Sequence, residues 1–285
     1  MVDPGMALRG GRTAGGAPAD LAIAGGVLGP DPAGGPALDL GGLVVSPGYL
    51  DLQINGGLGL DFTTDPETMW EVGASLPASG VTAFLPTLVS TDLEVVDAAR
   101  RVVVAGPPHG YAGAAVLGLH VEGPFLARSR RGAHDPGKLR HPSPDLVEGW
   151  SPATGVRMVT LAPELPGGLA TIAALAGNGV VVSLGHSDAT FDQAMAGFDA
   201  GATMATHLFN AMSGMAHRSP GLAAATLAHP TVAAGLIADG HHVDAGAVRV
   251  ARAALGPDRI VLVTDAVAPT GAISGLTPCF MTSGQ

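Results

Sequence analysis

The sequence predicts a parallel (β/α)8 barrel of the TIM type. Eight short apolar runs recur with helical stretches between most of them, the pattern of a parallel sheet covered by helices. The expected strands are residues 48–54, 81–87, 115–121, 156–161, 180–185, 202–207, 232–238 and 260–264. Four runs end in or just before a residue that can bind metal or move a proton: Glu122, His186, His207 and Asp265. A parallel barrel gathers the carboxyl ends of its strands at one face, so these four should meet there.

Helix-start signals support the same alternation. Thr91 and Thr190 each stand three residues before a Glu or Gln, which is the spacing of a capping box. Asp65 precedes a proline, and Asp244 precedes an Ala- and Val-rich stretch, so both are expected to cap helices. A doubly wound open sheet is the alternative fold, but no glycine-rich dinucleotide fingerprint follows the first strand.

Composition narrows the classes of function. The net charge is −10 and no basic run occurs, so nucleic-acid binding is not expected. No uninterrupted apolar stretch is long enough for a membrane span, and the N-terminus lacks a signal-peptide core. Cys279 is the single cysteine, which excludes an internal disulfide and suits a reducing compartment. A cytoplasmic protein is therefore expected.

Glu122, His186 and His207 form a plausible set of three metal ligands. A catalytic zinc site combines imidazole and carboxylate ligands and keeps a fourth position for water, whose pKa the metal lowers. One such residue alone is more often structural, but three at strand ends favour a metal site. His120 shares the side-chain parity of Glu122 and is a weaker ligand candidate.

Asp265 follows the apolar run "IVLVT", which should be buried. A buried carboxylate must be paired, bound to metal or catalytic. As a general base it could take a proton from a metal-bound water and pass it to the leaving group. The alternative is an aspartate that caps the loop beyond the strand.

A series of linked motifs resembles the N-acetylglucosamine-6-phosphate deacetylases of the amidohydrolase superfamily. They run in family order from about residue 43 to 271: "SPGYLDLQINGG", "VTAFLPTLV", "GLHVEGPFL", "RGAHDP", "VTLAPE", "LGHSDAT", "GATMATHLFNAM", "SPGLAAA", "GLIADGHHVD" and "VTDAVAPTG". The resemblance implies that the three candidate ligands hold the metal. Asp265 would act as base and then acid, and His134 would contact the substrate and polarise its acetyl carbonyl.

The resemblance also implies how the substrate is bound. Asn210 and Ala211 would meet the sugar phosphate through amide or backbone groups, and Arg218 and His242 would bind the phosphate. In relatives the last two reach into a neighbouring subunit, which implies a homodimer. Arg suits phosphate through its planar fork. The alternative for Arg218 is a solvated loop charge, and the family pattern favours His242 over its neighbour His241.

The first strand carries Gln53 and Asn55 where many amidohydrolases have His-x-His and bind two metals. Neutral amides are poor zinc ligands compared with imidazole. One divalent metal is therefore expected, with Gln53 hydrogen-bonded to its water. Zinc fits the ligands best, although iron, cobalt or manganese can occupy similar sites.

The resemblance further implies a small β-sandwich domain, of which residues 1–46 would be an incomplete N-terminal part, followed by the amidohydrolase barrel at 47–285. The first dozen residues are expected to be loose. No closing helix is visible after the eighth strand, so we expect a barrel lacking its last helices, with apolar surface uncovered. The function alternatives are hydrolysis of a cyclic amide, or an inactive truncated barrel.

Overall fold

The computed structural model describes residues 6–29 and 36–271 of the 285-residue chain. The chain divides into two compact units, Met1–Gly48 and Tyr49–Gln285. The smaller unit contains a four-stranded sheet in the order β3-β2-β1-β4. Its strands are β1 (Met6–Arg12), β2 (Pro18–Ala24), β3 (Val27–Gly29) and β4 (Ala37–Asp39). The expectation of a loose first dozen residues is wrong from Met6 onward, because β1 pairs with both β2 and β4.

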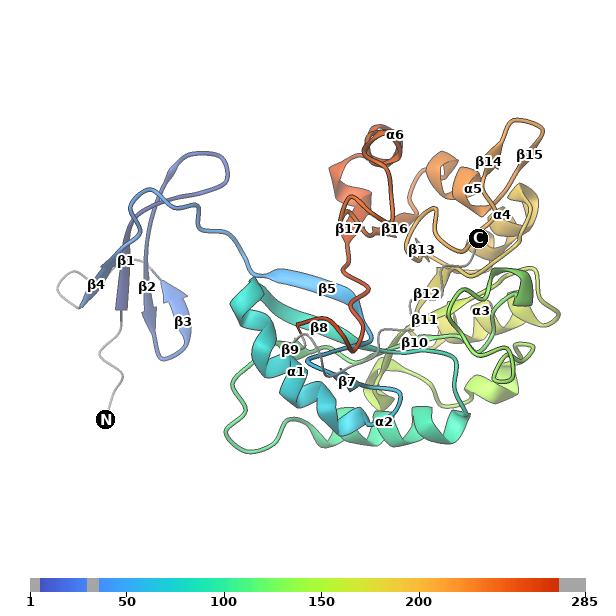
Figure 1. The fold of residues 1–285 in the computed structure, drawn as a ribbon, viewed down its shortest axis with the longest axis horizontal. Helices are drawn as coiled ribbons and strands as arrows, with labels where there is room; N and C mark the ends of the chain where they lie inside the picture. Colours follow the sequence, from blue (N-terminus) through green and yellow to red (C-terminus); the bar gives the residue numbers. More distant parts are fainter. Residues whose placement is uncertain (1–5, 30–35, 272–285) are drawn as a thin grey trace. The chain divides into compact units, whose positions relative to one another are not determined.

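The larger unit is built on a nearly closed parallel barrel of eight strands, which confirms the predicted fold (Figure 1). The strand order β5-β8-β10-β11-β12-β13-β16-β17 follows the chain. The barrel strands are β5 (Tyr49–Ile54), β8 (Val81–Leu88), β10 (Leu119–Glu122), β11 (Val156–Leu161), β12 (Val181–Leu184), β13 (Met204–Ala205), β16 (Ala233–Leu236) and β17 (Ile260–Leu262). A short β9 (Ala115–Val116) also pairs with β8.

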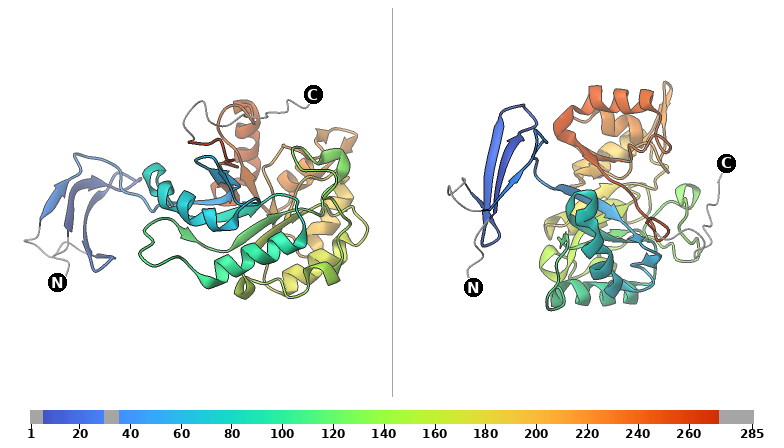
Figure 2. Two further views of the ribbon diagram at one scale, coloured as in Figure 1. Left: turned by 60° about the horizontal axis from the view of Figure 1, so that its bottom comes forward. Right: turned by 60° about the vertical axis from the view of Figure 1, so that its left-hand side comes forward.

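Helices cover the outer side of this curved sheet, as Figure 2 shows. They are α1 (Met69–Ser75), α2 (Leu93–Ala105), α3 (Gly168–Gly177), α4 (Phe191–Asp199), α5 (Leu222–Ala228) and α6 (Ala245–Leu255). Two small hairpins complete the unit: β6 (Gly56–Gly57) with β7 (Leu60–Asp61), and β14 (Met215–Ala216) with β15 (Ser219–Pro220). The main apolar core lies between the sheet and these helices.

Three of the four predicted caps are confirmed. Thr190 makes a capping box at α4, Asp244 caps α6, and Asp65 caps a single 3-10 turn before α1. The capping box predicted at Thr91 is wrong, because the N-cap of α2 is Asp92. The Asp92 carboxylate makes no capping bond and instead pairs with Lys138 and Arg140, which lie in the loop after β10.

Side chains inside the barrel are arranged in layers. One layer is apolar and contains Leu85, Met158 and Met204. Two residues further along the strands, a polar layer is fully or almost fully buried: Thr87, His120, Thr160, Ser183 and Thr206. Because side chains on a strand alternate between faces, Glu122 lies on the same face as His120, beyond this polar layer. The interior therefore changes from apolar to polar toward the carboxyl ends of the strands.

No continuous backbone ladder joins β5 to β17 within the described part of the chain; an isolated bridge links Ile54 to Ala266. The segment after β17 runs beside β5, as seen in Figure 1, and hydrogen-bonds to it. Tyr49 on β5 and Leu262 on β17 are 65% and 63% exposed. This line between the two end strands is called the seam below.

The expected lack of a closing helix concerns mainly residues 272–285, which lie outside the described residues. None of the helices between residues 6 and 271 that the structure describes has the length and apolarity needed to cross a bilayer.

The capping box at α4 gives a direct test of the local structure. Thr190 is exposed, and its Oγ1 accepts a hydrogen bond from Gln193 N at 3.3 Å. We expect Thr190→Ala to lower the free energy of unfolding by about 1 kcal/mol, because the backbone N–H of Gln193 loses its partner at the helix start. Urea unfolding would measure it. Thr190→Ser keeps the hydroxyl and should stay near the parent; equal stability of all three proteins would contradict the assignment.

Candidate metal and hydrolytic site

The structure brings three of the predicted residues together at the carboxyl ends of the strands. Glu122 ends β10, His186 follows β12 and His207 follows β13. All three are buried, and a ligand atom of each lies within 4.8 Å of the others. This group is called the triad below. It lies at the face where the (β/α)8 fold places its functional residues.

The contacts of the triad converge on one oxygen. Glu122 Oε1 is 3.1 Å from His186 Nε2 and 3.1 Å from His207 Nε2, and the two nitrogens are 3.0 Å apart. Gln53 Nε2 donates to the same oxygen at 3.1 Å. The expected contact of Gln53 with a metal-bound water stays a prediction; its amide is placed beside the triad by the bond to Glu122.

The protonation of His186 tests whether these residues suit a cation. His186 Nδ1 lies 2.8 Å from the carbonyl oxygen of Arg130, which can only accept, so Nδ1 carries the proton. In the neutral ring Nε2 then has a free lone pair, and that lone pair faces a carboxylate and a second imidazole. Either a cation among these three buried atoms or a proton on His207 Nε2 would satisfy them. The donor set of two imidazoles and one carboxylate is that of a zinc-type catalytic site.

The pKa shifts express the same need for a cation. Burial alone would raise the pKa of Glu122, but the hydrogen bonds and charges of His186 and His207 hold it well below its usual value. Burial would lower the pKa of His207, but its bond to Glu122 raises it. A shared proton thus compensates the carboxylate when no metal is bound, and metal and proton would compete for the same nitrogen.

Backbone strain accompanies these residues. His186, His207 and Asp265 have φ values of 47°, 30° and 51°, in the left-handed region that non-glycine residues rarely occupy. Such conformations persist only where the surroundings fix them, and they cluster at functional sites. The strain indicates that these side chains are held in place at a cost to the fold.

Asp265 lies beside the triad. Its backbone N donates to Gln53 O at 2.9 Å, and its Oδ1 accepts from Asn55 Nδ2 at 2.7 Å. Burial, together with the charge of Glu122, raises the pKa of Asp265 to about 6. A carboxylate with a pKa near neutrality can both take and return a proton.

His134 packs against the triad, with its ring centroid 4.5 Å from that of His186. Its Nδ1 accepts from Ser90 N at 3.0 Å and contacts Ser90 Oγ at 2.8 Å. Burial lowers the pKa of His134 to about 4, so the ring is neutral at pH 7. Since Nδ1 is an acceptor, the proton lies on Nε2, which makes that atom a hydrogen-bond donor beside the triad.

His120, the weaker ligand candidate, is not part of the triad. Its ring nitrogens contact Thr87 Oγ1 at 3.3 Å and Thr160 Oγ1 at 2.7 Å, within the polar layer. Burial lowers its pKa to about 4. His120 shares a strand face with Glu122, as expected, but lies deeper in the barrel and bonds hydroxyl groups there.

The predicted phosphate-binding pair, Arg218 and His242, is exposed. Arg218 lies in the turn between β14 and β15, and His242 Nδ1 pairs with Asp239 Oδ2 at 2.7 Å. Neither forms a hydrogen bond or an ion pair with the triad among the described residues. Asn210 and Ala211 lie in the loop that begins at His207; Asn210 N donates to His207 O at 2.9 Å, and Ala211 has a φ of 46°.

Two residues that the sequence did not single out support the site. Ser90 follows β8 and fixes the His134 ring. Glu164 follows β11, and its carboxylate accepts from Ser187 Oγ at 2.7 Å and from Asp188 N at 2.6 Å, directly after His186. Both are polar residues beyond the carboxyl end of a strand, which is the signal that identified the triad.

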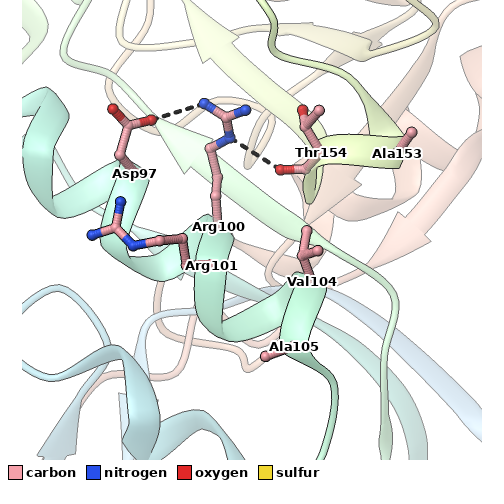
Figure 3. A pocket seen from close by; sticks show the side chains of 7 residues that line it. All are labelled: Asp97, Arg100, Arg101, Val104, Ala105, Ala153 and Thr154. Atoms are coloured by element: carbon pink, nitrogen blue, oxygen red, sulfur yellow. Dashed lines mark hydrogen bonds and ion pairs between the residues drawn. The ribbon is translucent and has the colours of Figure 1, made fainter.

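A depression of about 500 Å³ lies away from the triad, on the outer surface of α2 (Figure 3). Arg100 there donates to Asp97 Oδ1 at 2.8 Å and to Thr154 O at 3.0 Å. The bond to Thr154 joins α2 to the turn before β11, and the bond to Asp97 lies within α2. No residue of the triad lines this depression, and its chemistry is structural.

The chain is similar in sequence to known deacetylases of N-acetylated amino-sugar phosphates. No protein-family profile matches it. It is 42% identical over 252 residues to a human N-acetylglucosamine-6-phosphate deacetylase, covering 83% of this chain. It is 37% identical over 236 residues to an N-acetylgalactosamine-6-phosphate deacetylase of Escherichia coli O157:H7, covering 81% of this chain.

A solved structure from Mycobacterium smegmatis is also similar. It is an aspartate-to-alanine variant of N-acetyl-D-glucosamine-6-phosphate deacetylase in complex with N-acetyl-D-glucosamine-6-phosphate. The TM-score is 0.82 at 36% identity, over 94% of this chain and 72% of that one.

The chain spans 61% of the length of the human relative and 62% of the Escherichia coli relative. From the motifs, the fold and these similarities together, the chain belongs to the N-acetylglucosamine-6-phosphate deacetylase family.

Proposed function

We propose that the chain carries the catalytic centre of a metal-dependent deacetylase that hydrolyses the acetamide of N-acetylglucosamine 6-phosphate. The products would be glucosamine 6-phosphate and acetate. The observation that carries this proposal is the convergence of His186 Nε2 and His207 Nε2 on Glu122 Oε1, beside a carboxylate of raised pKa at Asp265. The relatives' names supply the substrate.

Glu122, His186 and His207 would hold one divalent metal, and zinc suits this donor set best, with iron, cobalt or manganese as alternatives. When bound, the metal would supply a water of lowered pKa and polarise the acetyl carbonyl. Asp265 accepts a proton from the attacking water and donates it to the amine nitrogen as the amide bond breaks. Asn55 donates a hydrogen bond to Oδ1 of Asp265, and this bond fixes the orientation of the carboxylate.

His134 would donate a hydrogen bond from Nε2 to the acetyl oxygen, where negative charge develops. Ser90 N holds the required tautomer, and the lowered pKa keeps the ring neutral. A hydrogen-bond donor that is already in position stabilises the negative charge of the transition state without having to reorganise. This electrostatic stabilisation is often the largest single contribution to catalysis. Gln53 would then assist by orienting Glu122.

Arg218, His242, Asn210 and Ala211 would bind the sugar phosphate. Arg218 and His242 are exposed and, in the part of the chain that the structure describes, make no hydrogen bond to the triad of the same chain. This supports a role across a homodimer interface, as does the family resemblance. Binding of a phosphate by Arg is favoured by its paired N–H donors. We propose a cytoplasmic location for such an enzyme, because its substrate is a phosphorylated sugar.

A second candidate substrate is N-acetylgalactosamine 6-phosphate, favoured by the similarity to the Escherichia coli relative. The two sugars differ at one hydroxyl and would use the same hydrolytic groups. Hydrolysis rates measured side by side on the two sugar phosphates distinguish these substrates. A cyclic amide, measured in the same way, tests the alternative that the chain hydrolyses cyclic amides.

We expect Asp265→Asn to lower kcat by about 10²- to 10⁴-fold, because the amide cannot accept the proton of the attacking water. Metal per chain should stay at the parent value, measured by elemental analysis of the same sample. Asp258→Asn, at an exposed carboxylate before β17, is the matched control. Near-parent turnover of Asp265→Asn would show that another group is the base.

Arg218→Ala should raise KM for the sugar phosphate more than it lowers kcat, since a phosphate contact is made equally in the ground and transition states. Steady-state kinetics would measure both constants. Arg249→Ala, at an exposed arginine on α6, should behave as the parent does. Equal parent activity toward unphosphorylated N-acetylglucosamine would refute the phosphate role.

Zinc should raise the melting temperature of metal-stripped protein, because it binds the folded triad. At a free zinc concentration about 100-fold above Kd the added stability is about 2.7 kcal/mol. Glu122→Gln should lose most of this shift, while Glu148→Gln, at an exposed site, should keep it. An equal zinc response in both variants would place the binding site elsewhere.

A further inference from the structure

Asp51 is a buried carboxylate that the proposed mechanism does not use. It lies in the middle of β5, is 3% exposed, and lines a cavity together with Val72 of α1 and Thr264. Within the described residues it forms no ion pair. A buried charge without a cation is costly, so its hydrogen-bond partners must compensate for it.

Those partners lie across the seam. Asp51 Oδ2 accepts from Thr264 Oγ1 at 2.6 Å and from Thr264 N at 3.2 Å, and Oδ1 lies 3.3 Å from the same nitrogen. Oδ1 also accepts from Gln53 N at 3.0 Å. Bonds to an ionised acceptor are stronger than neutral ones. The carboxylate therefore joins the two end strands where no continuous backbone ladder does.

Thr264 directly precedes Asp265, so the position of one sets the position of the other. Asp265 is on one side of the seam, and Gln53, which bonds Glu122, is on the other. The left-handed φ of 51° at Asp265 needs fixed neighbours to persist. Asp51 holds the residue before it, Gln53 O holds its backbone nitrogen, and Asn55 holds its carboxylate.

We propose that Asp51 is a positioning residue: by clamping Thr264 across the seam, it places the Asp265 carboxylate beside the triad. The catalytic part of this inference rests on the proposed function. Asp51 is no second base, because both its oxygens already accept hydrogen bonds from Gln53 and Thr264. A displacement of about 1 Å at a reacting group can cost about 10²-fold in rate.

The test uses Asp51→Asn and Thr264→Val, with Thr264→Ser as the conservative variant that keeps the hydroxyl. We expect Asp51→Asn and Thr264→Val to lower kcat by at least about tenfold with KM within about twofold, since the substrate-binding groups stay in place. Metal per chain should be unchanged, and Thr264→Ser should retain most of the parent kcat. Parent-like kcat in Asp51→Asn and Thr264→Val would overturn the proposal.

Amide hydrogen exchange, measured by mass spectrometry, gives a readout that does not need activity. Asp51→Asn should speed exchange in peptides covering residues 263–266 and leave β11 peptides at the parent rate. Faster exchange throughout the barrel would identify Asp51 as a general stabiliser and overturn the proposal, as would unchanged exchange at 263–266. If the parent fails to hydrolyse the sugar phosphate, the proposed function fails, and the exchange result still decides whether the clamp exists.

Discussion

Glu122 Oε1 lies within 3.1 Å of three nitrogen atoms, in an interior from which bulk water is excluded. Two of these nitrogens belong to imidazoles, and that of His186 presents a lone pair because its other nitrogen is committed to a backbone carbonyl. A positive charge among these atoms, from a metal ion or from a proton on His207, stabilises the arrangement. The other polar groups around it, including Gln53, Asp265 and His134, are placed with respect to that charge.

The side chains inside the barrel become more polar from one layer to the next toward the triad. Below the triad, Thr160 Oγ1 lies 2.7 Å from both His120 Nε2 and Thr206 Oγ1, and Thr206 Oγ1 lies 2.6 Å from Ser183 Oγ. These hydroxyls can each donate and accept, so a closed set of bonds satisfies the layer without water. Farther down, Leu85, Met158 and Met204 provide apolar packing. The polar layer thus lies between the apolar layer and the ionisable side chains of the triad.

Much of this arrangement could be predicted from the sequence, because strand periodicity and the position of polar residues at strand ends are local signals. The eight strands and the meeting of Glu122, His186 and His207 follow from them. The partners of these residues could not be predicted. Ser90 bonds His134 across 44 residues, and Asp51 bonds Thr264 across 213. Such pairs depend on which strands become neighbours and in what register. The capping box expected at Thr91 also failed, because the N-cap of α2 lies one residue later, at Asp92.

The left-handed backbone at His186, His207 and Asp265 has an evolutionary consequence. Glycine occupies such conformations without steric penalty, so glycine at any of the three would relax the polypeptide. Selection for folding alone would therefore favour loss of these side chains, and a lineage released from the need to turn over substrate should lose them early. Each of the three side chains is therefore held at a cost in folding stability.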